Sequence, residues 1–207
     1  MIEVKQVPKS SLEREEIYRM RYDVYIGEKR YAQKYVDHVR KTICEPLDED
    51  GFVYGAFAGN QIVGTVRTNY ASQSQLEEYF DLFGVNPRLF PNAALSTKLI
   101  VTPAYRGTTL ALRLCAATYL QALRDGIRYG FIDCDPSMAP LYERLGFRAY
   151  RSVRYRFPER GEGVVMVIDI RDRVYLCKVH SPLLRFGRTM DEVSQRDKHA
   201  PVSSEHF

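Results

Sequence analysis

Leu99-Ile-Val-Thr-Pro-Ala-Tyr-Arg-Gly-Thr-Thr-Leu-Ala111 is the segment of this sequence that carries the most structural information. It reads as the end of an apolar strand, a tight turn at Pro103 and the beginning of a helix. The backbone N–H groups at a helix N-terminus have no partner within the helix, and the helix dipole favours an anion there. Arg106 adds a fixed positive charge, and Gly107 lets a ligand approach the backbone closely. The segment therefore predicts a site for a pyrophosphate-like anion, with an ordinary strand-to-helix turn as the alternative.

The elements on either side of this segment predict an α/β domain. We expect a strand over Ala94–Val101, a helix from Thr108 or Thr109 to about Arg124, a strand over Tyr129–Cys134 and a short helix over Ser137–Leu145. The other expected strands are Met1–Val7, Phe52–Ala58, Gln61–Asn69, Arg148–Phe157 and Val164–Ile170. Further helices are expected from Ser10, with Glu13 in a capping box, and over Gln75–Phe83, and Asp37–Gly51 is expected to be a loop. This order predicts a mixed central sheet flanked by helices.

The composition fits one globular domain followed by a polar tail. Of the 207 residues 45% are hydrophobic, and the formal net charge of +4 is too small to indicate nucleic-acid binding. Because the sequence from about Thr189 is polar and without periodicity, we expect one domain over 1–188 and a flexible tail over 189–207. No apolar stretch predicts a signal peptide or a membrane span. The four cysteines lack metal-ligand spacing, so we expect reduced thiols in a cytoplasmic protein and no metal.

A second informative segment is Ser137-Met-Ala-Pro-Leu-Tyr-Glu-Arg-Leu-Gly-Phe147. Together with the first segment, about forty residues upstream, it resembles the two cofactor motifs of the GNAT superfamily of acyltransferases. The resemblance covers most of the chain from Phe52 to Arg156. It implies a GNAT-type mixed sheet and a thioester donor whose pyrophosphate would bind at Arg106, Gly107, Thr108, Thr109 and Ala111. The central glycine of the family's motif is Thr109 here, which crowds the loop that would hold coenzyme A.

Acyl carrier protein presents its acyl group on phosphopantetheine without a pyrophosphate, and a donor of that kind tolerates the threonine. The early Arg21-Tyr-Asp-Val-Tyr25, the acidic Pro46-Leu-Asp-Glu-Asp-Gly51 and the strand Gly64-Thr-Val-Arg67 resemble the GNAT branch that uses such donors. This branch holds the acyl-homoserine-lactone synthases and the N-acyl amino acid synthases. The sequence has no Trp, and Lys98 stands where the lactone enzymes have Arg. The resemblance therefore favours an N-acyl amino acid synthase.

This resemblance implies a division of roles among the site residues. A backbone N–H of the strand Leu99, Ile100 and Val101 would stabilise the oxyanion, and Tyr142 would give a proton to the leaving thiolate. Asp48 or Glu49 would accept the proton of the amine, directly or through water. The remaining candidates for binding the acceptor are charged residues: Arg21, Asp50, Arg67 and Lys98. Structural ion pairs are the alternative for the two arginines, and a solvated loop is the alternative for the acidic residues.

Basic residues exceed acidic ones by roughly seven between Arg144 and Arg188. The surface near Arg151, Arg154 and Arg156 is therefore a candidate docking site for the acidic acyl carrier protein, with a solvated basic face as the alternative. Two other functions stay open on the same scaffold. One is an acetyl-CoA-dependent N-acetyltransferase, and the other is a thioester-binding module without catalysis.

Overall fold

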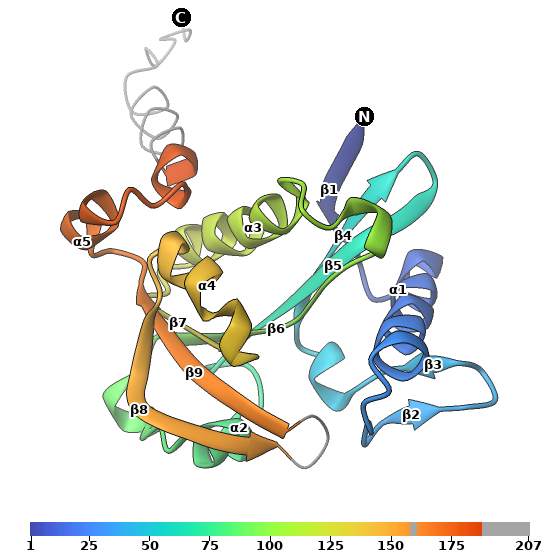
Figure 1. The fold of residues 1–207 in the computed structure, drawn as a ribbon, viewed down its shortest axis with the longest axis horizontal. Helices are drawn as coiled ribbons and strands as arrows, with labels where there is room; N and C mark the ends of the chain where they lie inside the picture. Colours follow the sequence, from blue (N-terminus) through green and yellow to red (C-terminus); the bar gives the residue numbers. More distant parts are fainter. Residues whose placement is uncertain (158–160, 188–207) are drawn as a thin grey trace, which may run out of the picture.

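The computed structural model describes residues 1–157 and 161–187, with the backbone alone for residues 152–157. Its centre is a seven-stranded sheet with the order β1-β4-β5-β6-β7-β9-β8 (Figure 1). Every neighbouring pair in this sheet is antiparallel except β6 and β7, which are parallel. The strands are β1 (Ile2–Gln6), β4 (Phe52–Ala58), β5 (Gln61–Tyr70), β6 (Ala93–Val101), β7 (Tyr129–Cys134), β8 (Arg148–Phe157) and β9 (Gly161–Asp169). The expected mixed sheet is confirmed, and the expected tail over 189–207 lies outside the described residues.

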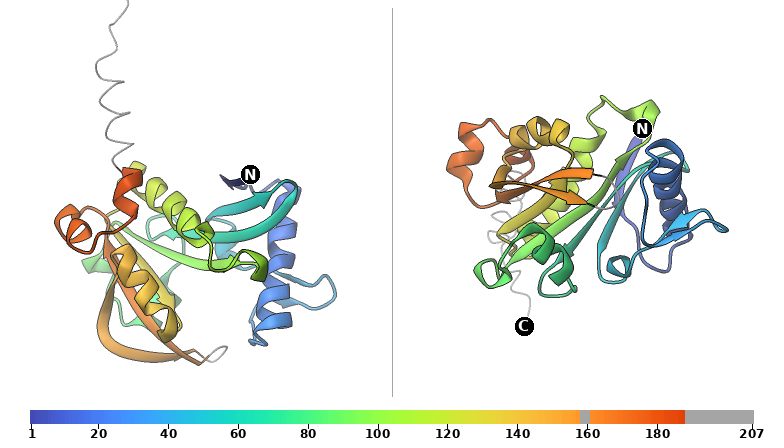
Figure 2. Two further views of the ribbon diagram at one scale, coloured as in Figure 1. Left: turned by 45° about the horizontal axis from the view of Figure 1, so that its top comes forward. Right: turned by 60° about the horizontal axis from the view of Figure 1, so that its bottom comes forward.

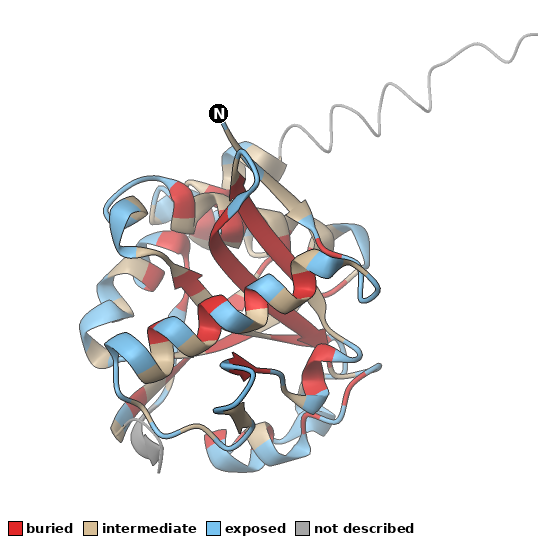
Figure 3. Ribbon diagram, turned by 90° about the vertical axis from the view of Figure 1, so that its right-hand side faces the viewer, coloured by how far each residue is buried: buried red, intermediate tan, exposed pale blue. Residues whose placement is uncertain are grey.

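Helices cover both faces of this sheet. The helices are α1 (Leu12–Tyr22), α2 (Glu77–Phe83), α3 (Leu110–Arg124), α4 (Ala139–Leu145) and α5 (Arg173–Lys178). Strand β4 shows the division, since Val53 and Phe57 pack with residues of α1 while Tyr54 and Ala56 pack with residues of α3. Because successive side chains of a strand point to opposite faces, α1 and α3 lie on opposite sides. Figure 3 shows the resulting pattern, with buried residues along the central strands and helices buried on one side only.

Helix α1 continues directly into a π-helix, η1 (Asp23–Glu28). Its signature is the bond from the Lys29 amide to the Val24 carbonyl, five residues earlier, at 2.8 Å. Ser11 caps α1 by accepting a hydrogen bond from the Glu13 amide at 3.2 Å. The prediction of Ser10 as the cap was therefore one residue early. A π-turn adds one residue to a helical turn. The side chains of η1 therefore point in other directions than a continued α-helix would give them.

The stretch Asp37–Gly51, expected to be a loop, contains three short elements. A two-stranded ribbon joins β2 (Val36–Asp37) to β3 (Thr42–Ile43), and a 3₁₀ turn, η2 (Pro46–Asp48), follows. At the start of η2 the Asp48 carboxylate accepts a hydrogen bond from the Glu45 amide at 2.8 Å, and Pro46 occupies the first turn. Side-chain capping and a buried Ile43 hold this stretch, and neither produces the sequence periodicity by which elements are predicted.

Strands β6 and β7 pair over three residues and then separate. Their register joins Ala93, Ala94 and Leu95 to Tyr129, Gly130 and Phe131, and the rest of β6 pairs only with β5. Between β5 and β6 the register shifts, so that two residues of β6, Lys98 and Leu99, stand opposite Val66. Lys98 has a φ of 57°, the left-handed conformation that a bulge provides. The bulge therefore turns β6 away from β7 and leaves a gap between them.

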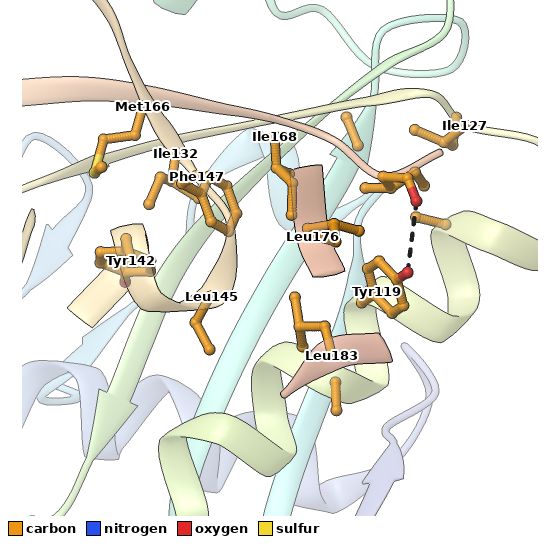
Figure 4. Close-up of a cluster of buried hydrophobic side chains, with 14 of the residues drawn as sticks. Tyr119, Ile127, Ile132, Tyr142, Leu145, Phe147, Met166, Ile168, Leu176 and Leu183 are labelled. Carbon is orange, nitrogen blue, oxygen red and sulfur yellow. Dashed lines mark hydrogen bonds between the residues drawn. The ribbon is translucent and has the colours of Figure 1, made fainter. Parts of the chain in front are cut away.

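Helix α4 closes this end of the core. It follows a 3₁₀ turn, η5 (Pro136–Met138), and presents Tyr142 and Leu145 to a cluster that also contains Phe147 and Met166 (Figure 4). Pro140 lies within its first turn, as predicted. Gly146 ends it with a φ of 105°, and a Cβ atom there would lie 2.3 Å from Leu176 Cδ2. Helix α5, which carries Leu176, was not predicted.

Strand β9 begins at Gly161, three residues before the predicted start at Val164, and ends one residue early at Asp169. It lies between β7 and β8, so β8 forms one edge of the sheet and β1 the other. Figures 1 and 2 show β8 and β9 at one end of the molecule and α1 with β2 and β3 at the other. The gap between β6 and β7 therefore lies between the end that contains β8 and β9 and the end that contains α1.

Candidate active site

The gap between β6 and β7 is lined on one side by the backbone of β6. The Thr102 amide donates to the Val63 carbonyl of β5 at 3.0 Å. Because the amides of successive strand residues point to opposite sides, the Val101 amide points away from β5 and toward the gap. The Val101 carbonyl points the same way and accepts a hydrogen bond from Arg106 Nε at 3.0 Å. The end of β6 thus offers a backbone donor beside the guanidinium of Arg106.

The segment from Arg106 to Ala111 forms the expected turn and helix start. Gly107 has a φ of 77°, and a Cβ there would meet nothing within 4 Å, so the turn leaves open space above the backbone. Thr109 is the N-cap residue of α3 but makes no capping hydrogen bond with its side chain. Thr108 Oγ1 accepts from the Leu110 amide at 3.2 Å. The amides of Ala111 and Leu112 fall in the first turn, where a helix has no partner for them.

Tyr142 lies at the same end of the gap and is 8% exposed. Its ring packs edge-on against Phe147, with the ring centroids 5.6 Å apart. Burial raises the pKa of the Tyr142 hydroxyl well above its ordinary range, and the nearby Cys115, Cys134 and Tyr25 raise it further. A tyrosine in this state stays protonated at neutral pH and is able to donate a proton.

A cluster of buried charges lies behind β6. Arg21 Nη1 donates to both carboxylate oxygens of Asp48, at 2.9 and 2.8 Å, and neither side chain is exposed. Arg67 Nη1 lies 3.2 Å from Asp48 Oδ1 on the other side. Burial by itself would raise the pKa of Asp48, but Arg21 and Arg67 outweigh it and lower that pKa to about 2. Asp48 is therefore a fixed negative charge.

The cluster continues to Lys98 through Glu45. Arg67 Nη2 donates to Glu45 Oε2 at 2.7 Å and to Thr97 Oγ1 at 2.9 Å. Lys98 Nζ lies 2.5 Å from Glu45 Oε1 and 5.0 Å from the centroid of the Tyr25 ring. Burial lowers the pKa of Lys98, since the attraction of Glu45 compensates for only part of the lost solvation. The β6 bulge places this lysine, which is 11% exposed, at the edge of the cluster.

The cluster has more positive charge than its own carboxylates balance. It contains three cations, Arg21, Arg67 and Lys98, and two anions, Glu45 and Asp48. Within the described residues, Arg21 Nε and Nη2 are buried and make no hydrogen bond. An unbalanced buried charge is costly, and an anion that approached these groups would reduce the cost. The arrangement suits a carboxylate.

The sequence candidates divide into two sets. Arg21, Asp48, Arg67 and Lys98 lie in this cluster, whereas Glu49 and Asp50 are exposed on the surface, where Glu49 pairs with Lys9 at 3.3 Å. Sequence reasoning missed Glu45, which joins Arg67 to Lys98. Its position directly before Pro46, at the start of the acidic segment, was the available signal.

An open groove of about 770 Å³ lies between the α1–η1 helix and the sheet. Its walls come from α1 and η1 on one side, and from the β4–β5 turn and Thr102–Pro103 on the other. Neither Tyr142 nor Lys98 lines it, but Glu28 does. Over the residues that the structure describes, no helix has the length and apolar character needed to cross a membrane. Over the same residues, no three side chains of the metal-binding types gather into a group.

A family model described as N-acyl amino acid synthase FeeM matches residues 16–168. The chain belongs to this family. A FeeM family member is an N-acyltransferase, so the predicted class of reaction is confirmed. The match includes the buried charge cluster, the β6 bulge and Tyr142. No curated protein matches the sequence.

Solved structures show the same fold for this FeeM family member. FeeM from uncultured soil microbes superposes with a TM-score of 0.67 at 15% identity, over 90% of this chain and 98% of that one. The CoA-dependent acyl-homoserine lactone synthase BjaI, with SAM and isopentyl-CoA, gives a TM-score of 0.64 at 21% identity, over 88% and 90%. A GNAT-family acetyltransferase from Staphylococcus aureus gives 0.58 at 16% identity, over 83% and 100%. The predicted GNAT-type fold is confirmed.

Proposed function

We propose that this protein transfers an acyl group from a pantetheine thioester on acyl carrier protein to the amine of an amino acid. The observation that carries the proposal is the separation of β6 from β7 after Leu95 and Phe131, beside the Arg106 turn. A pantetheine arm fits such a gap because its amides can pair with the strand edges that the separation leaves open. The FeeM family match supports the amine acceptor.

In the proposed reaction the amine nitrogen attacks the thioester carbonyl carbon and gives up its proton through water, and the C–S bond then breaks. The Val101 amide, which points into the gap, is the donor that we assign to the developing oxyanion. Tyr142 gives its proton to the departing sulfur, a role that fits its protonated hydroxyl and its burial beside the gap. Ile100 and Val101 pair with Thr65 and Gly64 of β5, which holds Val101 in place, and Leu99 lies in the adjoining bulge.

The acceptor would lie against the charge cluster. We assign its carboxylate to Lys98 and to the excess positive charge that Arg21 and Arg67 supply. We assign Asp48 the role of keeping the two arginines in position. We do not assign it the role of the base, because a carboxylate with a pKa of about 2 is a weak base. Glu49 and Asp50 are exposed, so they would act on the amine only through water.

The assignment of acyl carrier protein rests on charge and on the turn. The Thr109 side chain stands where the GNAT motif has glycine, and Arg151 is exposed on the edge strand β8. The other two docking candidates, Arg154 and Arg156, have side chains outside the described residues. Charge reversal at Arg151 should raise the KM for acyl carrier protein and leave turnover of free acyl-pantetheine unchanged. Equal effects on both donors would refute the docking surface.

One observation favours a second candidate, an acetyl-CoA-dependent N-acetyltransferase. The turn at Gly107 is open, and Arg106 stands beside it as it would for a pyrophosphate. Thermal stabilisation by coenzyme A but not by acyl carrier protein would favour this donor. Binding of a thioester without turnover of any amine would instead indicate a module without catalysis.

Mass spectrometry of lipid extracts from cells that express the chain tests the main proposal. The expected result is a new N-acyl amino acid that is much less abundant in cells expressing Tyr142→Phe. Its mass gives the acyl group and the amine together. Extracts with no new N-acyl compound, from cells that contain the folded protein, would contradict the proposal.

A further inference from the structure

Arg106, the fixed cation of the turn, is already paired with a carboxylate of the same chain. Its Nη1 lies 2.6 Å from Glu28 Oε1, and its Nη2 lies 2.5 Å from Glu28 Oε2. Both terminal nitrogens of the guanidinium are thus engaged in a two-point contact, which is the strongest geometry for such a pair. Lys29 Nζ also lies 3.5 Å from Glu28 Oε1. The pair is partly open to solvent, with 40% of the Arg106 side chain and 32% of the Glu28 side chain exposed.

The π-helix η1 is what brings Glu28 to this position. Glu28 is its last residue, and the bond from the Lys29 amide to the Val24 carbonyl closes the wide turn around it. No other contact between Arg106 and a carboxylate is found within the described residues. The π-helix η1, which continues α1, therefore supplies a negative charge to the Arg106 turn.

A phosphate oxygen that binds Arg106 must compete with Glu28 for the same two nitrogens. Coenzyme A brings a pyrophosphate and a further phosphate on its ribose, so it meets the negative charge of Glu28 with several charges of its own. The pantetheine arm of a carrier protein has a single phosphodiester, and a simple acyl-pantetheine has no phosphate. The competition is therefore strongest for coenzyme A and weakest for donors with little phosphate.

We propose that Glu28 is a specificity-determining residue that selects against coenzyme A as the acyl donor by occupying Arg106. The inference rests on the proposed function, because it places the donor's phosphates at the Arg106 turn. Glu28 does not touch the reacting atoms in this arrangement. It acts by pairing with Arg106, so that a highly charged donor cannot use this positive charge. The gap between β6 and β7, where we place the pantetheine arm, stays open.

Calorimetric titration with two probes tests this inference. The probes are coenzyme A and S-octanoylpantetheine, which has the arm and an acyl chain but no phosphate. The proteins are the wild type, Glu28→Gln and the control Glu16→Gln. Glu16 is an exposed carboxylate on the preceding helix that lines the same groove, and its substitution removes the same charge. Circular dichroism and the Tm of each variant confirm that it folds.

Glu28→Gln should lower the Kd for coenzyme A about fivefold, which corresponds to breaking one partly exposed ion pair. Its Kd for S-octanoylpantetheine should stay within about twofold of the wild type, and Glu16→Gln should stay within that range for both probes. An equal effect of the two substitutions, equal tightening of both probes, weaker coenzyme A binding, or no coenzyme A binding by any of the proteins would each overturn the inference. These titrations need no acceptor. A protein that acylates no amine would refute the proposed function, but the comparison of the Kd values for the two probes could still be interpreted.

Discussion

Arg21 and Asp48 form an ion pair in which one guanidinium nitrogen contacts both carboxylate oxygens, at 2.9 and 2.8 Å, with no exposed surface on either side chain. The pair joins helix α1 to the 3₁₀ turn η2, which are separated along the chain by η1 and the β2–β3 ribbon. Arg67 of β5 approaches the same carboxylate, so three separate segments meet at Asp48. The pair therefore fixes the position of the charge cluster relative to the sheet.

Removing the Asp48 charge should strongly destabilise the protein. Asp48→Asn would leave Arg21 buried without an opposing charge, and breaking a buried pair in this way costs about 3–5 kcal/mol. The free energy of unfolding, measured by urea denaturation at pH 7, checks this. The control is Glu49→Gln, which affects only an exposed pair with Lys9 and should change the same quantity by about 0.5 kcal/mol or less. A similar small change for both variants would contradict the assigned role of Asp48.

The same pair should make stability depend on acid. The pKa of Asp48 falls from an ordinary value of 3.8 to about 2 in the folded chain, so the carboxylate is more acidic folded than unfolded. Its contribution is fully present above pH 4 and is lost as the pH falls from about 4 toward 2. Urea denaturation between pH 5 and pH 2.5 should show a smaller loss of stability for Asp48→Asn than for the wild type. Parallel curves for the two proteins would show that Asp48 is not the group responsible.

Tyr142→Phe should lower kcat by about 100-fold, the typical contribution of a general acid, and leave the KM for the donor nearly unchanged. Steady-state kinetics with the acceptor found in the lipid extracts measures both constants. Tyr70→Phe is the matched control, because Tyr70 is also buried with a raised pKa but donates to Asp125 at 2.7 Å, away from the gap. Equal loss of kcat in both variants would indicate a general effect on folding instead of proton donation.

Lys98→Met should reduce the preference for an amino acid over the corresponding amino acid amide. If Lys98 binds the acceptor's carboxylate, the ratio of kcat/KM for the two acceptors should fall about tenfold, as expected for loss of one charged hydrogen bond. Lys34→Met, which changes a lysine that is 61% exposed, should leave this ratio unaltered. An unchanged ratio in Lys98→Met would exclude the lysine as the carboxylate's partner.

Two glycines with positive φ should respond differently to alanine. Gly146→Ala would place a Cβ 2.3 Å from Leu176 Cδ2, and Leu176 is fully buried, so both backbone strain and overpacking apply and the cost should be about 2–4 kcal/mol. Gly107→Ala meets no atom within 4 Å and should cost about 1 kcal/mol from strain alone. Urea denaturation of both variants measures the difference in the free energy of unfolding. Equal losses would show that the Leu176 side chain moves aside without a cost in stability.

The sequence predicted best where periodicity and turn chemistry agree. The strand Ala93–Val101 and the helix Leu110–Arg124 match the predicted ranges to within a residue or two, because an apolar strand, a proline turn and a long helix follow one another. The start of α1 was missed by one residue because Ser10 and Ser11 both have the chemistry of a cap. Helix α5 was missed because six residues are too few for a helical period.

The candidate site was only partly predictable for a different reason. Arg21, Asp48, Arg67 and Lys98 were all candidates, and pairing of Arg67 with the acidic loop was one of the alternatives, which its contact with Asp48 confirms. The sequence does not show that all four residues meet. Glu45 was missed because its role comes from contacts with β5 and β6, which only the folded sheet supplies. Glu28 was missed because a π-turn leaves no recognisable pattern and its partner, Arg106, belongs to a distant turn. The residue types therefore indicated the chemistry and the chance of ion pairs, and only the structure shows which residues pair.

The three-residue contact between β6 and β7 makes the sheet two smaller sheets that share a short seam. Two hydrophobic clusters hold the halves together near the seam, since each contains residues of both β6 and β7. Beyond the seam, the facing edges of β6 and β7 do not pair with each other. The proposed pantetheine arm would make some of the hydrogen bonds that β6 and β7 would make with each other in a continuous sheet. Binding of the proposed donor should therefore stabilise the folded chain and raise its melting temperature.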